Sequence, residues 1–150
     1  MVMSLVENKK AGFNYEITDK YEAGIELLGH ETKSVRAKHG SLEGAYVKIR
    51  GSEAFLVGAT VPPFQVGNTP KNYDPERVRR LLLTKQELKY LTGRESERGL
   101  TLIPLALYNK GRYIKLSFGV ARNKKKFDKR EDIKKRETDR EIHRDIKGLR

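Results

Sequence analysis

Hydrophobic and polar residues alternate along the first third of the chain with the two-residue period of β-strands. Residues 13–17 alternate in this way, and residues 21–28 have the composition of a second strand, interrupted by Gly24. Residues 31–38 contain neither Gly nor Pro and end at His39-Gly40, as a short helix would. The pattern therefore predicts two strands followed by a short helix.

A β-hairpin and a long loop are predicted next. Residues 45–50 alternate again, Gly51-Ser52 has the composition of a turn, and residues 54–57 continue as an apolar run. Four prolines fall within residues 62–75, together with Gly67 and two asparagines. This composition predicts a surface loop rather than a strand or helix.

A capped helix and a second hairpin complete the pattern. Thr84 stands three residues before Glu87, which is the spacing of a capping box, and the helix that follows is expected to end at Gly93. Residues 100–108 and 112–120 have the composition of two further strands, joined by a turn that contains Gly111. These two segments predict a long antiparallel pair.

The order of these elements determines the fold class that we expect. No strand–long helix–strand unit occurs, so a parallel α/β sheet is disfavoured. We predict a mainly β protein with short helices: an antiparallel barrel of the oligonucleotide-binding type, formed by residues 13–121. Residues 1–12 are expected to form a polar N-terminal arm, and residues 122–150 a basic C-terminal tail.

The charge distribution separates this tail from the barrel. The chain has 32 Lys and Arg against 20 Asp and Glu, a formal net charge of +12. Residues 122–150 hold 13 basic and 7 acidic residues, so 29 of the 150 residues carry half of the excess charge. A segment with so few large apolar residues cannot offset its ordering entropy, and we expect it to be disordered when alone.

Several function classes are disfavoured by composition. The chain has no Cys, which excludes disulfides and Cys-ligated metals, and its three His residues share no ligand spacing. No apolar run is long enough for a membrane span, and the first eight residues lack the features of a signal peptide. We therefore expect a cytoplasmic protein with no metal, no cofactor, no membrane partner and no catalytic residues.

The basic excess indicates a polyanionic partner, and nucleic acid fits it best. Basic residues cluster at positions 77–80 and 122–126, where they can neutralise phosphates. Unpaired bases can stack on aromatic rings such as Tyr15, Tyr21, Tyr73 and Phe127, although residues like the first three more often pack in the barrel. Glu22 could accept hydrogen bonds from base amino groups, although its residue type alone favours a salt bridge.

Motifs in unbroken order from about residue 8 to residue 147 resemble one known family, the SsrA-binding proteins, also called small protein B. Each motif is weak alone, but the ordered set is highly specific. The matching stretches are Asn8-Lys9-Lys10-Ala11, Tyr21-Glu22-Ala23-Gly24-Ile25, residues 29–36, Tyr46-Val47, residues 74–83, residues 99–105 and Phe127-Asp128-Lys129-Arg130 with Ile133-Lys134 following.

This resemblance implies a non-enzymatic role in trans-translation. The barrel would bind the tRNA-like domain of transfer-messenger RNA, and the complex would enter a ribosome stalled without a stop codon. The tail would then fold into a helix in the empty messenger channel. A helix of about 25 residues spans roughly 35–40 Å, which suits a channel lined by ribosomal RNA.

The resemblance also assigns residues to these roles. Family RNA-binding positions correspond to Asn8, Glu22, Leu82, Arg122, Lys124 and Lys125, and basic residues of the matching motifs complete the set: Lys9, Lys10, Lys33, Arg36, Arg79 and Arg80. The ribosome-engaging residues of the tail are Phe127, Asp128, Lys129, Arg130, Lys134 and Arg136. The family usually has Gly at the position of Asn123 and His or Tyr at that of Phe127.

Two alternatives belong to other classes. A generic single-strand-binding barrel would show salt-sensitive binding with little preference among RNAs. A metal-dependent nuclease could use Asp74 with Glu76, or Asp128 with Glu131 and Asp132, to hold Mg²⁺. Both acidic groups lie among Arg and Lys, which favours surface salt bridges.

We expect a monomer that binds transfer-messenger RNA and the ribosome.

Overall fold

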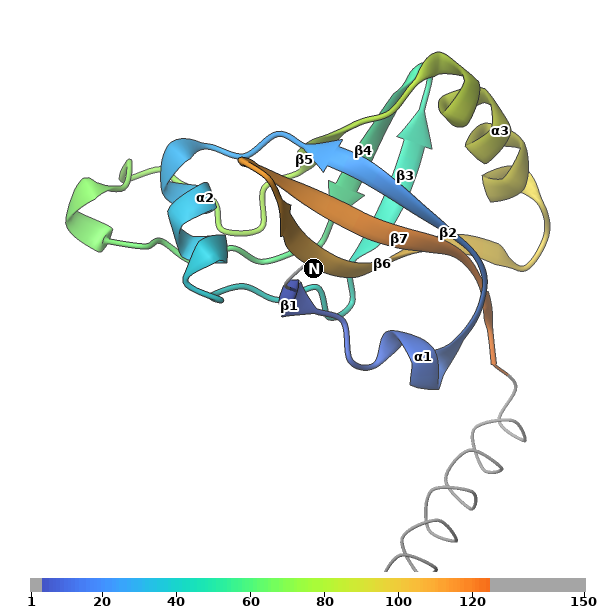
Figure 1. Ribbon diagram of the computed structural model, residues 1–150, viewed down its shortest axis with the longest axis horizontal. Helices are drawn as coiled ribbons and strands as arrows, with labels where there is room; N and C mark the ends of the chain where they lie inside the picture. Colours follow the sequence, from blue (N-terminus) through green and yellow to red (C-terminus); the bar gives the residue numbers. More distant parts are fainter. Residues whose placement is uncertain (1–3, 125–150) are drawn as a thin grey trace, which may run out of the picture.

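A computed structural model of the chain describes residues 4–124, with the side chain of Asn68 excepted. Within this range seven antiparallel strands and a few short helices form one unit (Figure 1). The strands are β1 Ser4–Glu7, β2 Tyr15–Ile25, β3 Tyr46–Arg50, β4 Glu53–Val57, β5 Arg79–Leu82, β6 Leu100–Lys110 and β7 Tyr113–Asn123. The helices are α1 Ala11–Asn14, α2 Gly29–Arg36 and α3 Lys85–Ser96, with a 3₁₀ turn at Val66–Asn68.

Six of the strands close into a ring. β6 pairs with β3, and the chain of pairings continues through β4, β5, β2 and β7 back to β6, always antiparallel. β1 extends the sheet by pairing with the other end of β6. The ring confirms the predicted fold class, a mainly β barrel with short helices.

The two-residue period of the sequence decides which side chains fill the barrel. Along β7 the inward residues Ile114, Leu116, Phe118 and Val120 are buried, and they alternate with more exposed positions over the first half of the strand. The hairpin of β3 and β4 buries Val47, Ile49, Ala54 and Leu56 in the same way. The main hydrophobic core that results has members from Leu5 to Val120. A second, smaller cluster consists of Ala11, Ile103 and Ala121.

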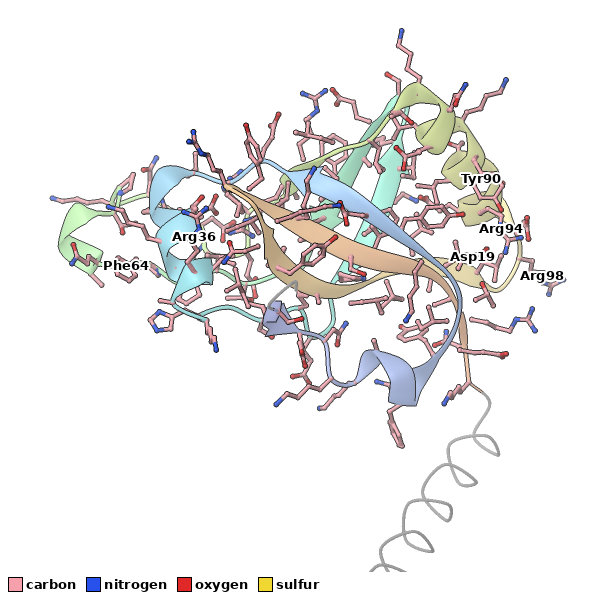
Figure 2. All side chains as sticks on the ribbon, in the orientation of Figure 1. Asp19, Arg36, Phe64, Tyr90, Arg94 and Arg98 are labelled. Atoms are coloured by element: carbon pink, nitrogen blue, oxygen red, sulfur yellow. The ribbon has the colours of Figure 1, made fainter. Side chains whose placement is uncertain are left out.

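Helices α2 and α3 lie at opposite ends of the barrel (Figures 1 and 2). The predicted capping box of α3 is confirmed: the Glu87 N–H donates to Thr84 Oγ1 at 3.2 Å, and the Thr84 N–H donates to Glu87 Oε1 at 3.1 Å. The predicted end at Gly93 is wrong, because the helix continues to Ser96. Gly99, three residues after the end of α3, has a left-handed backbone at φ 82°, where the chain turns into β6.

The polar arm predicted for residues 1–12 is also wrong over its described part. Residues 4–7 form β1, in which Leu5 and Val6 are buried against the core. Two adjacent buried residues produce no alternation, so the strand had no periodic signal. The segments predicted as separate strands at 13–17 and 21–28 belong mostly to the single strand β2, which is irregular between Ile17 and Asp19.

Strand β5 was not predicted, because residues 77–80 were interpreted as a basic cluster. In the structure Arg79 and Leu81 face inward, while Arg80 and Leu82 face solvent. The strand pairs with β4 and β2 and so closes the ring. At the other boundary β7 continues to Asn123, so Arg122 and Asn123 belong to the sheet rather than to a separate tail.

Candidate nucleic-acid interface

Glu22 lies on the outer face of the barrel, where β2, β7 and β6 run side by side. Its two carboxylate oxygens are held separately. Lys110 Nζ donates to Oε1 at 2.9 Å, and the Tyr108 hydroxyl donates to Oε2. Glu22 is therefore in a salt bridge, as its residue type suggested, and 39% of its side chain remains exposed.

These contacts fix the charge states on this face. The hydrogen bond from Tyr108 and the one from Lys110 lower the pKa of the Glu22 carboxyl, because both stabilise the ionised form. Burial and the bond to Glu22 raise the pKa of the Tyr108 hydroxyl. At neutral pH Glu22 is therefore an acceptor of hydrogen bonds, and Tyr108 is a donor.

Leu82 is the apolar neighbour of this carboxylate. It pairs with Gly24 in the sheet, and Gly24 lies two residues from Glu22 on the same outer face. A Cβ atom added to Gly24 would stand 3.2 Å from the Leu82 Cβ atom, so Leu82 rests directly against the glycine backbone. With 49% of its surface exposed, Leu82 provides an apolar platform beside Glu22.

Cationic side chains surround this acidic and apolar centre. Lys115 is on β7, where it pairs with Gly24 of β2 on one side and with Tyr108 of β6 on the other. Arg36, at the end of α2, donates to the Arg112 carbonyl at 2.7 Å and so joins the helix to the β6–β7 turn (Figure 2). Lys33 is exposed on the same helix. We call Glu22, Leu82, Tyr108, Lys110 and Lys115 the outer patch.

Arg80 is exposed and lies within 3.5 Å of both Glu26 and Glu53. Surface pairs of this kind are weak, so the guanidinium remains available to a phosphate. Arg79 is different, because its side chain is completely buried. The prediction that Arg79 contacts RNA is wrong, since alternation along β5 places this residue inside the barrel.

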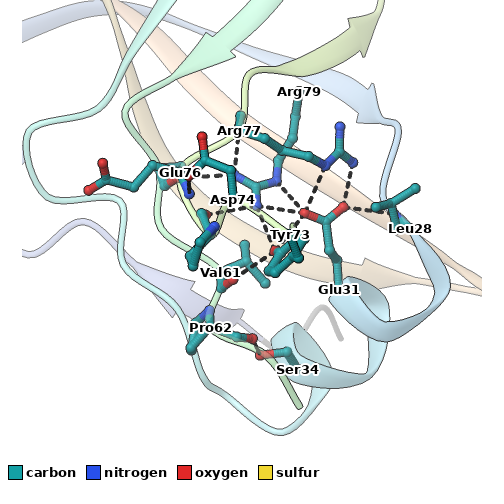
Figure 3. A network of polar contacts seen from close by, with 12 residues as sticks. Leu28, Glu31, Ser34, Val61, Pro62, Tyr73, Asp74, Glu76, Arg77 and Arg79 are labelled. Carbon is teal, nitrogen blue, oxygen red and sulfur yellow. Dashed lines mark hydrogen bonds and ion pairs between the residues drawn. The ribbon is translucent and has the colours of Figure 1, made fainter. Parts of the chain in front are cut away.

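The Arg79 guanidinium belongs to a buried network centred on Glu31 (Figure 3). Arg79 Nη2 and Nε donate to Glu31 Oε2 at 2.6 and 3.0 Å, and Arg77 binds the same carboxylate. Tyr73 donates to Glu31 Oε2 at 2.9 Å. Arg79 also donates to the carbonyls of Ala59 and Pro75, each at 3.0 Å. The network joins α2, the 58–78 loop and β5, and thereby sets the positions of Lys33 and Leu82.

The charge of Glu31 is stabilised despite its burial. Burial raises the pKa of this carboxyl, but hydrogen bonds from Arg77, from the Leu28 N–H and from Arg79 outweigh that effect and lower it to about 2. Removal of the Glu31 carboxylate would leave the buried Arg79 guanidinium as an unpaired charge. Glu31, Arg77 and Arg79 thus form a structural ion network rather than an RNA-binding surface.

A second group of predicted residues lies at the other end of β2. The Asn8 side chain donates to the Pro104 carbonyl at 2.9 Å, and Lys10 pairs with Glu43 at 2.7 Å. Both residues line a cavity of about 430 Å³, together with Tyr15 and Tyr46. Tyr15 lies seven residues before Glu22, so roughly 23 Å of strand separates this cavity from the outer patch.

The start of the predicted basic strip lies beside this cavity. Arg122 pairs with Glu16 across the sheet, and the Lys124 N–H donates to the Asn14 carbonyl at 3.0 Å. Asn123 lies within β7, and in the described residues the only non-glycine residue with a positive φ is Lys38. Glycine is therefore not required at position 123. Lys9 is exposed between β1 and α1.

The other predicted stacking and tail residues have different outcomes. Tyr21 packs on Phe118 at a ring distance of 5.8 Å, and Tyr73 belongs to the Glu31 network, so both serve the interior. Seven predicted contacts lie outside the described residues and stay predictions: Lys125, Phe127, Asp128, Lys129, Arg130, Lys134 and Arg136.

Residues 4–124 contain neither a metal-binding cluster nor a membrane-spanning helix. No group of three or more His, Asp or Glu side chains there is arranged to hold a metal ion. The Asp74 carboxylate accepts the Glu76 N–H at 2.9 Å, as in a turn. Asp128, Glu131 and Asp132 lie outside this range. No helix in the same range is long and apolar enough to cross a membrane.

The sequence did not identify Tyr108, Lys110 and Lys115 as members of the outer patch. Their outward positions follow from alternation with Leu107, Ile114 and Leu116, once β6 and β7 are known to pair. The sequence therefore contained a signal for their outward positions. It did not contain the register that places β2 beside β7 and so brings these residues to Glu22.

The fold and the outer patch define a small antiparallel barrel protein with a cationic outer face around one anchored carboxylate. The family model described as SmpB protein matches residues 5–148. An SsrA-binding protein of Gloeobacter violaceus is 50% identical over 140 residues, which cover 93% of this chain and 91% of the relative. One from Cupriavidus necator is 47% identical, with 97% of each chain covered.

A solved chain is similar in structure as well as in sequence. It comes from a structure described as "tmRNA-SmpB: a journey to the center of the bacterial ribosome". The TM-score is 0.68 and the identity 40%, with 83% of this chain and 85% of the solved chain covered. The chain belongs to the SmpB protein family.

Proposed function

We propose that this chain binds transfer-messenger RNA and acts with it on stalled ribosomes in trans-translation. The observation that carries the proposal is the match along almost the whole chain, from residue 5 to residue 148, to the SmpB family. A member of that family solved with transfer-messenger RNA and the bacterial ribosome has the same barrel at 40% identity. The net charge of +12 suits a polyanionic partner.

We further propose that the outer patch contacts the tRNA-like domain of that RNA. A carboxylate accepts hydrogen bonds from base amino groups, and the exposed Leu82 can pack against an unstacked base. Lys110, Lys115 and the nearby Arg36 carry the positive charge that phosphates require. Because the carboxylate contributes selectivity while the cations contribute affinity, the two kinds of residue are expected to respond differently to substitution.

The remaining predicted residues extend this proposal. Asn8, Arg122 and Lys124 would contact RNA at the other end of β2, near the cavity between α1 and β3. Residues of the C-terminal segment, among them Phe127 and Lys134, would occupy the empty messenger channel. Their basic composition supports the proposal, since that channel is lined by ribosomal RNA.

This function requires no chemistry from the protein itself. We propose that the chain is an adaptor that positions one RNA on a larger ribonucleoprotein, without catalysis. It would act in the cytoplasm, where ribosomes translate. A nuclease role has no support among the described residues, because they contain no group of three metal-binding side chains.

Binding to transfer-messenger RNA tests the proposal directly. The full-length protein should bind this RNA in preference to bulk tRNA at moderate salt. Equal affinity for the two RNAs would favour the generic single-strand-binding barrel and would contradict the proposal.

Substitution of Glu22 tests the role of the outer patch. We expect Glu22→Ala to weaken binding to transfer-messenger RNA about 10-fold, as loss of a hydrogen bond to a charged group would. A protein that binds only through counterion release would bind more tightly, because the substitution adds one positive charge. Glu97→Ala is the matched control, since it changes the charge equally just after α3, where Glu97 pairs with Arg94. Tighter or unchanged binding of Glu22→Ala would contradict the role assigned to the patch.

A further inference from the structure

Tyr108 is the least exposed member of the outer patch, although its hydroxyl serves a surface carboxylate. Only 8% of the residue is accessible to solvent. The side chain starts on β6 and reaches past β7 to Glu22 on β2. A buried tyrosine hydroxyl usually has a specific partner, and here that partner is Glu22 Oε2.

The two groups that hold Glu22 differ in rigidity. Lys110 is an exposed lysine, with 56% of its side chain in solvent, and such surface pairs are weak and mobile. Tyr108 has a rigid ring with two side-chain torsions, and the packing around that ring keeps its hydroxyl in place. The orientation of the Glu22 carboxylate is therefore set mainly by Tyr108.

A fixed carboxylate is a better binding group than a free one. The terminal torsion of a glutamate is broad, so an unheld carboxylate loses rotational freedom when it binds a ligand. A carboxylate has about four acceptor positions, and Tyr108 and Lys110 use one on each oxygen. The remaining positions are available on the exposed side of Glu22.

We propose that Tyr108 is a positioning residue, which orients the Glu22 carboxylate so that its free acceptor positions meet the amino groups of unpaired bases in the RNA partner. This inference rests on the proposed function, because it requires Glu22 to contact transfer-messenger RNA. Tyr108 itself does not touch the RNA. Its contribution is transmitted entirely through Glu22.

A double-mutant cycle tests this dependence. Binding of transfer-messenger RNA is measured for the full-length protein and for Tyr108→Phe, Glu22→Ala and the double variant. Tyr108→Phe keeps the ring and removes only the hydroxyl, so we expect affinity to fall about 3- to 10-fold. In the Glu22→Ala background the same change should alter affinity by less than about 2-fold, because no carboxylate remains to be oriented.

Two further measurements separate positioning from a structural or electrostatic effect. The salt dependence of binding should keep its slope in Tyr108→Phe, because no phosphate contact is lost. Tyr113→Phe is the matched control: it removes a hydroxyl from the start of β7, where 71% of the residue is exposed and no side-chain partner is present within residues 4–124. This control should bind as the unmodified protein does.

The outcomes distinguish the two levels of the proposal. Equal losses from Tyr108→Phe in both backgrounds, or no loss in the unmodified background, would overturn the positioning role and leave the proposed function intact. A full-length protein with no preference for transfer-messenger RNA would overturn the proposed function and this inference together. A smaller salt slope in Tyr108→Phe would also overturn the inference, because it would mean that the hydroxyl helps to bind phosphate.

Discussion

Two glutamates, Glu22 and Glu31, are held by hydrogen bonds in very different surroundings. Glu31 is completely buried and binds two arginines, whereas Glu22 is partly exposed and binds one tyrosine and one lysine. Burial makes the charge of Glu31 dependent on its partners, while solvent leaves the free acceptor positions of Glu22 accessible. The same residue type therefore serves the fold in one place and, in the proposed function, a binding surface in the other.

Loss of the Glu31 carboxylate is expected to destabilise the barrel severely. Glu31→Ala leaves the buried Arg79 guanidinium without its anionic partner, which costs about 3–5 kcal/mol. Urea unfolding measures this free energy. Glu97→Ala is the control, because its pair with Arg94 is exposed and should contribute less than about 1 kcal/mol. A similar small loss for both variants would contradict the structural role of the network.

Glu31 also makes the free energy of unfolding depend on pH in the acid range. Its folded pKa is about 2, below the ordinary value of 4.5, so the unfolded chain takes up a proton first as the pH falls. The stabilisation, about 3 kcal/mol, is present above roughly pH 4.5 and is lost as the pH falls toward 2. Unfolding free energies of the unmodified protein and of Glu31→Gln should therefore converge across this window. Parallel curves would contradict the assignment.

The sequence alone could not separate these roles at the level of single residues. Arg79 and Arg80 are adjacent and chemically identical, yet one is buried and the other exposed. The difference depends on the strand β5, whose charged residues conceal the alternation. Glu22 was identified through a family motif, whereas its partner Tyr108 lies 86 positions away and required the register of three strands.

Secondary-structure elements were predictable where one face is apolar and the other polar. β3 and the first half of β7 show that pattern, whereas β4 and β6 are mostly apolar and bounded by turn residues; all four were expected close to their observed bounds. β1 and β5 have four residues each and were missed, because their sequences show no clear alternation of apolar and polar residues. α3 was predicted from its capping box, which is a local signal and independent of the rest of the fold.

Two glycines provide a test at the level of elements. A Cβ atom at Gly119 would stand 2.7 Å from Ile17 Cγ2 and 2.9 Å from the Asp19 carbonyl oxygen, where β2 is irregular. Gly119→Ala should therefore cost about 1–3 kcal/mol by overpacking. Nothing lies within 4 Å of a Cβ atom at Gly93, inside α3, so Gly93→Ala should stabilise the protein by about 0.5–1 kcal/mol. Thermal or urea unfolding of both variants checks the opposite signs.

On the scale of the whole molecule, the net positive charge is divided equally between residues 1–121 and the C-terminal segment 122–150. In the outer patch of the barrel, the cationic side chains surround the Glu22 carboxylate, which Tyr108 and Lys110 hold in place. Residues 122–150 hold half of the excess charge and few large apolar residues. A molecule organised in this way can recognise one RNA with its barrel and contact another with the segment that follows.

This division predicts that the two activities can be separated by truncation. The buried hydrophobic residues of the described part lie between residues 5 and 121, and the outer patch lies within residues 22–115, so deletion of residues 127–150 removes neither. We expect the truncated protein to keep its thermal unfolding transition and its preference for transfer-messenger RNA. Peptide tagging on stalled ribosomes should be abolished, because the segment proposed to occupy the messenger channel is gone. A clear fall in the unfolding temperature, or retained tagging, would show that barrel and segment are not independent in this way.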